Sequence, residues 1–149
     1  MSDFDDAIDE MQEMIVEQAR EQYSETVVDH WLHPRNFGPM DHPDGHARVE
    51  GECGDSMDIF LRVRDGRIVL ASFLTDGCIT SIAAGSMAVK LAGGVDLAAA
   101  RTVSDDAILD ALGGLPEESE HCALLASNTL HAAVEDHGRS RQDSRGLSC

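Results

Sequence analysis

The sequence is poor in positive charge and aromatic residues, and it has no long apolar run. Its 149 residues carry 11 Lys and Arg against 28 Asp and Glu, a formal net charge of −17. Such a surface repels the phosphate backbone of nucleic acids, and four Phe, one Tyr and one Trp offer few platforms for stacked bases. No apolar run approaches the ~18 residues that a membrane-spanning helix needs. We therefore expect neither nucleic-acid binding nor membrane insertion.

Cysteine is also scarce. The four cysteines are Cys53, Cys78, Cys122 and Cys149. The acidic start of the chain lacks the basic and then apolar segments of a secretory signal. We therefore expect a cytoplasmic protein, and in that compartment cysteines more often bind metal or react than form disulfides.

Charge and periodicity divide the chain into three predicted parts. Residues 1–22 hold eight acidic residues and one arginine, and they predict an acidic N-terminal helical extension. Residues 23–137 carry the alternating patterns of one folded domain. Residues 138–149, rich in Gly, Ser and Arg, predict a disordered tail.

The N-terminal third predicts helix. Apolar residues recur at steps of three and four from Phe4 to Val27. Ser24 is a good N-cap, so a break near residues 22–24 with a second helix after it is consistent with the pattern. Pro34 ends the helical stretch, because proline lacks the N–H group and disfavours helix in the residue before it.

A β-hairpin is predicted in the middle of the chain. Residues 57–64 alternate with period two, with Ile59 and Leu61 on one face and Asp58 and Arg62 on the other. The pair Asp65-Gly66 tolerates positive φ at both positions and predicts a two-residue turn. Further strands are predicted over 67–74 and 46–52.

The rest of the chain predicts helices, over 79–92, from Ser104 to Leu112, and over about 120–137. The order of elements, α-β-β-β-α-α-α, predicts an α+β fold. We expect a small three-stranded antiparallel sheet with helices packed on one face.

Three of the cysteines fall at the ends of predicted elements. Cys53 lies between the first two strands, Cys78 precedes the helix that follows the sheet, and Cys122 opens the last helix. Their wide separation contains no CxxC pair, which excludes a zinc ribbon. Gly54 and Gly77 adjoin two of these cysteines and permit a sharp turn or a close backbone approach.

Asp55 and His121 add one oxygen and one nitrogen donor beside these cysteines. Three thiolates with one harder ligand suit zinc or an iron–sulfur centre. Because a carboxylate binds iron less covalently than a thiolate, a cluster with such a ligand would be released more easily. A permanent redox centre would favour four cysteines.

Four separated motifs, in chain order, resemble the IscU/NifU-type family of iron–sulfur cluster assembly scaffolds. They are YSETVVDHWLHPRNFG (23–38), GECGD (51–55), DGCITSIAAGS (76–86) and HCALLA (121–126). The resemblance covers about residues 23–137, nearly the whole predicted domain.

The resemblance implies a non-catalytic scaffold that receives sulfide from a cysteine desulfurase and iron from an iron donor. The scaffold would build a labile [2Fe–2S] cluster and transfer it to apo iron–sulfur proteins. Cys53, Cys78 and Cys122 would be cluster ligands, and Asp55 the fourth ligand or the residue that keeps the cluster labile. His121 would be an alternative ligand and Cys122 the sulfur acceptor. Zinc can occupy the same ligands.

The sequence also departs from the family. Housekeeping members carry a Leu-Pro-Pro-Val-Lys stretch that a dedicated Hsp70 chaperone reads, whereas this chain has Leu115-Pro116-Glu117-Glu118-Ser119. The missing Val and Lys argue against chaperone-assisted release. Asp76 stands where the family often has an aromatic residue, and it brings another carboxylate near the predicted site.

Two other functions fit the same residues. One is a zinc-binding protein, as a sulfur acceptor or an interaction domain, and the other is a thiol or zinc enzyme. Against a thiol enzyme, His121 and Cys122 are neighbours, and neighbouring side chains on a helix point about 100° apart, a poor arrangement for a base and its nucleophile.

Overall fold

The computed structural model describes residues 2–52 and 54–148. Side chains are described for residues 6–52 and 54–139. In chain order the elements are α1 (Ser2–Gln22), α2 (Glu25–Leu32), β1 (Gly45–Glu50), β2 (Ser56–Arg64), β3 (Arg67–Thr75), α3 (Ile79–Ala92), α4 (Leu97–Ala100), α5 (Asp105–Leu112), the 3₁₀ turn η1 (Glu117–Ser119) and α6 (His121–Ser148). The strands form one antiparallel sheet in the order β1-β2-β3. The predicted α+β fold is confirmed.

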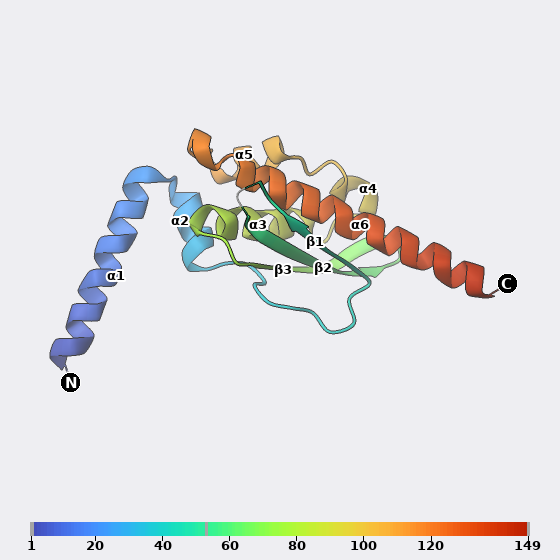
Figure 1. The fold of residues 1–149 in the computed structure, drawn as a ribbon, viewed down its shortest axis with the longest axis horizontal. Helices are drawn as coiled ribbons and strands as arrows, with labels where there is room; N and C mark the ends of the chain where they lie inside the picture. Colours follow the sequence, from blue (N-terminus) through green and yellow to red (C-terminus); the bar gives the residue numbers. More distant parts are fainter. Residues whose placement is uncertain (1, 53, 149) are drawn as a thin grey trace.

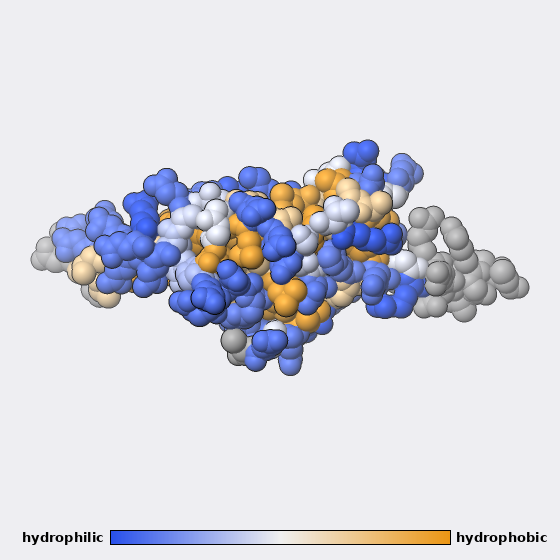
Figure 2. Space-filling view, turned by 90° about the horizontal axis from the view of Figure 1, so that it is seen from above, coloured by the Kyte–Doolittle hydropathy of each residue, from blue (hydrophilic) through white to orange (hydrophobic). Residues whose placement is uncertain are grey.

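The two N-terminal helices meet at Ser24, the predicted cap. Its hydroxyl accepts the Val27 N–H at 3.1 Å, which satisfies one of the free N–H groups of the first turn of α2. Helix α1 extends away from the body of the molecule (Figure 1). Figure 2 shows mainly hydrophilic residues over this helix. Four of its apolar side chains are nevertheless exposed, those of Ile8, Met11, Met14 and Ile15.

The hairpin forms as predicted. Asp65 and Gly66 both have positive φ, 55° and 75°, as the tight turn between β2 and β3 requires. Ile59 and Leu61 are fully buried beneath the helices, whereas Arg62 on the other face donates to the carbonyl of Asp41. The period-two pattern therefore identified the buried face of β2 correctly.

Helices α3 and α6 cover one face of the sheet, α3 against β3 and α6 along β1 (Figure 1). Gly85 makes the α3 contact possible, because an added Cβ there would lie 2.5 Å from Cδ2 of Phe73. The segment after α2 pairs with the open edge of β3. The Gly38 N–H donates to the Phe73 carbonyl at 2.9 Å, and the Phe73 N–H donates to the Asn36 carbonyl at 3.1 Å.

The C-terminal part differs from the prediction. Helix α6 continues through Gly138 to Ser148, where the sequence predicts a helix end and a disordered tail. A single glycine inside a helix costs about 1 kcal/mol relative to alanine, which is too little to end a long helix. Cys149 lies outside the described residues. Within the part of the chain that the structure describes, no helix is both long and apolar enough to cross a membrane.

Candidate functional site

Three chain segments meet at one end of the sheet: the β1–β2 connection, the β3–α3 connection and the start of α6. The first is a tight turn, in which the Gly51 N–H donates to the Asp55 carbonyl at 2.7 Å and the Gly54 N–H to the Gly51 carbonyl at 3.2 Å. Gly54 has φ of +85°, a conformation that favours glycine. Cys53, a predicted ligand, lies outside the described residues.

Two predicted ligands share the hydroxyl group of Thr80. Cys78 is the N-cap residue of α3, and Cys122 is the second residue of α6. The Cys78 Sγ lies 3.4 Å from Thr80 Oγ1, and the Cys122 Sγ lies 3.3 Å from the same oxygen. One hydroxyl group therefore links two cysteines that are far apart in the sequence.

The hydroxyl of Ser81 links the predicted carboxylate ligand to the same cluster. Ser81 Oγ donates to Asp55 Oδ2 at 3.2 Å and lies 3.5 Å from the Cys122 Sγ. Asp55, Cys78 and Cys122 thus come together around the first turn of α3.

His121 stands at the edge of this cluster, with its Nε2 3.7 Å from the Cys122 Sγ. Its ring borders a hollow of about 150 Å³ between the start of α6 and the turn at Gly51 and Glu52. The structure therefore places all four described candidate ligands in one region.

The two cysteines differ in their acidity. Burial raises the pKa of the Cys78 thiol, but the hydrogen bond with the Thr80 hydroxyl and the nearby N–H groups of Thr80 and Ser81 outweigh this effect and bring the pKa below its usual value. Free N–H groups at a helix N-terminus stabilise a thiolate in this way. Cys78 is also exposed, so its sulfur is accessible to reagents.

Cys122 shows the opposite behaviour. Burial raises the pKa of its thiol, the negative charges of Cys78 and Asp55 add to the effect, and the hydroxyls of Ser81 and Thr80 compensate only in part. These surroundings therefore favour the thiolate form at Cys78 and the protonated thiol at Cys122.

Gly77 allows these groups to lie so close together. An added Cβ at this position would lie 2.3 Å from Ser81 Oγ and 3.1 Å from Asp55 Oδ2. The glycine next to Cys78 thus serves a close approach, as the sequence suggests.

The carboxylate of Asp76 is directed at the backbone. Its Oδ1 accepts the Ser56 N–H at 2.8 Å. That hydrogen bond lowers the pKa of Asp76, with smaller contributions from the Ser56 side chain, its own N–H group and the charge of Arg48.

Among residues 2–52 and 54–148, no three His, Cys, Asp or Glu side chains form a group that could hold a metal ion. Hydroxyl groups bridge the sulfur and carboxylate atoms around Thr80 and Ser81, and Cys53 lies outside the described residues. Thr80 and Ser81 were not predicted from the sequence as residues of the site. Their positions in the first turn of a helix that begins after a cysteine were the available signal.

The chain matches the family described as NifU-like N-terminal domain over residues 22–144. This match spans most of the chain, so the protein belongs to the NifU-like N-terminal domain family.

Curated relatives resemble the chain over most of their own length. It is 42% identical over 118 residues to iron-sulfur cluster assembly scaffold protein IscU 1 of Archaeoglobus fulgidus, which covers 78% of this chain and 77% of the relative. It is 36% identical over 125 residues to the scaffold protein IscU of Escherichia coli K12, and the match covers 80% of this chain and 97% of the relative. The scaffold protein IscU of Aquifex aeolicus is 33% identical over 135 residues, covering 86% of each chain.

Solved structures share the fold. The N-terminal part of a nitrogen-fixing NifU-like protein from Brucella abortus superimposes with a TM-score of 0.61, covering 78% of this chain and 94% of the other at 19% identity. A scaffold protein described for the SUF system of Fervidobacterium islandicum also gives 0.61, covering 75% and 96% at 19% identity. The α+β arrangement is therefore that of the NifU-like fold.

Proposed function

We propose that this protein is a scaffold on which an iron–sulfur cluster is assembled and from which it is passed on. The observation that carries the proposal is the convergence of Asp55, Cys78 and Cys122 on the hydroxyls of Thr80 and Ser81. The relatives named as iron–sulfur cluster assembly scaffolds support it.

The proposed ligands are Cys53, Cys78 and Cys122, with Asp55 as the fourth ligand and His121 as the alternative to it. Thiolates are the usual ligands of [2Fe–2S] clusters, and one carboxylate or imidazole makes one iron less tightly held. The same donors suit tetrahedral zinc, which we propose as a competing occupant. The role is that of a carrier and not of an enzyme.

Sulfur would arrive as the outer sulfur atom of a persulfide on a cysteine desulfurase. Attack by the Cys122 thiolate on that atom breaks the S–S bond, leaves the donor cysteine as a thiolate and places a persulfide on Cys122. Release of sulfide then needs two electrons from an external reductant. Because Cys122 is buried and its surroundings favour the protonated thiol, docking of the desulfurase would have to uncover this thiol and accept its proton.

The partners we propose are a cysteine desulfurase, an iron donor and apo iron–sulfur proteins, in a reducing cytoplasm that keeps the cysteines as thiols. The acidic α1, with its exposed apolar side chains, supports docking of a partner that carries a basic surface. Deleting residues 2–20 should weaken binding of the desulfurase and leave the melting temperature nearly unchanged. Full binding by the shortened chain would exclude α1 from that interface.

Cluster assembly can be tested directly. The protein is mixed anaerobically with ferrous iron, cysteine and a desulfurase, and the visible charge-transfer absorption is followed. The parent should develop colour, and Cys78→Ser should not, because a cluster ligand is lost. No colour in the parent, or equal colour in Cys78→Ser, would reject the proposal. Asp110→Ala, on α5 and outside the site, serves as a control for handling.

The role of Asp55 needs a second measurement. Asp55→Ala should still form a cluster but should transfer it more slowly to an apo-protein, because the carboxylate that keeps the cluster labile has been removed. Transfer as rapid as that of the parent would exclude this role.

A further inference from the structure

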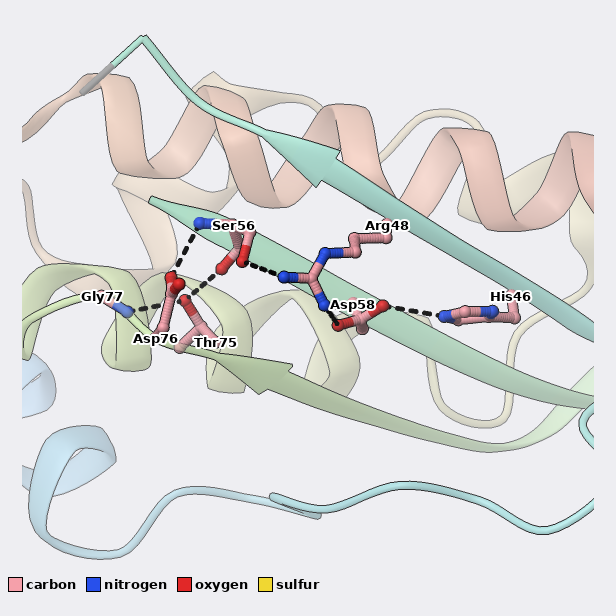
Figure 3. A network of polar contacts seen from close by, with 7 residues as sticks. All are labelled: His46, Arg48, Ser56, Asp58, Thr75, Asp76 and Gly77. Atoms are coloured by element: carbon pink, nitrogen blue, oxygen red, sulfur yellow. Dashed lines mark hydrogen bonds and ion pairs between the residues drawn. The ribbon is translucent and has the colours of Figure 1, made fainter. Parts of the chain in front are cut away.

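Side chains complete the sheet where its backbone ladder ends. The last paired residues of β2 and β3 are Met57 and Thr75. One residue further, the Ser56 N–H donates to Asp76 Oδ1 and the Ser56 carbonyl accepts the Thr75 hydroxyl, both at 2.8 Å (Figure 3). The Gly77 N–H in turn donates to Thr75 Oγ1 at 3.2 Å. Two side chains of the β3 end thus take the place of a strand neighbour.

Ser56 is also held from the other side. The Arg48 guanidinium on β1 donates to Ser56 Oγ at 3.1 Å and to the Asp58 carboxylate at 3.5 Å. Asp58 also lies 2.9 Å from the His46 Nε2 (Figure 3). Ser56 is buried, so this network fixes the start of β2 between its two neighbouring strands.

The network joins the chain neighbours of two proposed ligands. Asp55 directly precedes Ser56, and Cys78 follows Asp76 after one glycine. Between them, the Cα of Gly77 lies so close to Asp55 that an added Cβ would be 3.1 Å from Asp55 Oδ2. A shift between the two segments would therefore move the carboxylate relative to the cysteine.

We infer that Asp76 is a positioning residue of the proposed cluster site, which holds Asp55 beside Cys78 through the Ser56 N–H. The inference rests on the proposed function. The sequence did not decide whether Asp76 binds metal. We assign its carboxylate the role of orienting the ligand Asp55, without binding the metal itself. Groups that orient metal ligands typically contribute 10–100-fold to metal affinity.

Zinc affinity of the intact protein tests this role, measured by competition with a chromophoric chelator. Asp76→Ala should bind zinc about 10–100-fold more weakly than the parent. Asp76→Asn should recover most of the affinity, because the amide oxygen can still accept the Ser56 N–H. Asp110→Ala removes another exposed aspartate, on α5, and this variant should bind zinc like the parent. Equal affinity of Asp76→Ala and the parent, or equal weakness of Asp76→Asn and Asp76→Ala, would overturn the inference.

A double-mutant cycle separates positioning from general damage. If Asp76 acts through Asp55, then Asp76→Ala should cost little additional zinc affinity in a chain that already carries Asp55→Ala. Fully additive losses would contradict the inference. If the parent binds zinc but builds no iron–sulfur cluster, the proposed function fails, while the cycle still decides the role of Asp76.

A second variant covers the case in which Asp76→Ala does not fold. Thr75→Val keeps the size of the side chain and removes both of its hydrogen bonds in the network. We expect it to fold and to lose zinc affinity in the same direction. Unfolding of both variants would show that the network serves folding and not the position of Asp55, and would overturn the inference.

Discussion

At the scale of single residues, the site treats its two described cysteines differently although they share one hydroxyl group. Cys78 is the N-cap residue of α3 and is exposed near the N–H groups of the first turn, whereas Cys122 is buried next to negative charge. A scaffold that accepts sulfur and holds iron can use this difference, because the two thiols then differ in how readily they lose a proton and bind a metal ion.

The difference predicts the order of alkylation. With iodoacetamide near neutral pH, Cys78 should react before Cys122, because its lowered pKa gives more thiolate and its sulfur is accessible. Mass spectrometry of the digested protein reports each cysteine separately over a series of pH values. Thr80→Val should move the Cys78 profile to higher pH. A profile in which Cys122 reacts first would contradict the geometry of the site.

His30 predicts a pH dependence of stability. Burial lowers the pKa of this imidazole, the charges of Arg35 and Lys90 add to the effect, and Asp29 opposes it. Its Nδ1 lies 2.6 Å from Ser86 Oγ, which ties α2 to α3. The neutral ring is favoured in the folded state, so its stabilising contribution is present above the unfolded pKa of 6.5 and is lost as the pH falls through the folded value.

Urea unfolding at a series of pH values from about 7.5 to 5 should therefore show that stability falls more steeply in the parent than in His30→Asn. The comparison between the two proteins removes the contribution of the many carboxylates, which both share. Parallel pH profiles would show that His30 is not held neutral by its surroundings.

At the scale of elements, the packing of α3 on β3 depends on the absence of a side chain at Gly85. Gly85→Ala should destabilise the protein by about 1–3 kcal/mol, because the new Cβ overlaps the Phe73 ring. Gly138→Ala is the matched control: nothing lies within 4 Å of its ideal Cβ. It should stabilise α6 by up to about 1 kcal/mol. Denaturant unfolding measures the free energy of unfolding of both variants. A change of the same sign in both would contradict the close contact between Gly85 and Phe73.

Much of the secondary structure was predictable from short stretches of the sequence. The Ser24 cap, the Asp65-Gly66 turn and the bounds of α3 follow from caps, turns and periodicity, and the structure has them. The end of α6 was not predictable from Gly138, because helix propensity is weak compared with the continuation of a long helix.

The contacts within the site were less predictable. The sequence predicted that three cysteines lie at the ends of helices and strands and that they form one site with Asp55. It could not assign hydrogen bonds to Thr80, Ser81 and Asp76, because such bonds depend on how close two segments from different parts of the chain approach.

At the scale of the whole molecule, most of the core lies outside the site, although Cys122 belongs to both. The core's apolar side chains come mainly from the hairpin and from α3 and α6; among the fully buried ones are Ile59, Phe73, Ala84 and Leu130. A core of this size can stabilise a domain without a structural metal, which small metal-dependent domains need because their cores are too small.

The protein should therefore remain folded when its metal is removed. After treatment with a chelator, far-ultraviolet circular dichroism should show a native spectrum and a cooperative thermal transition, with a lower melting temperature reflecting only the lost binding energy. An unfolded chain after chelation would instead indicate a zinc-stabilised interaction domain.

We propose that the site holds iron together with sulfide, and the iron and acid-labile sulfide content of the protein purified without oxygen tests this proposal. Both should be present in comparable amounts, and both should be lost together in Cys78→Ser. Iron or zinc bound without any sulfide, in protein isolated alongside an active desulfurase, would contradict it.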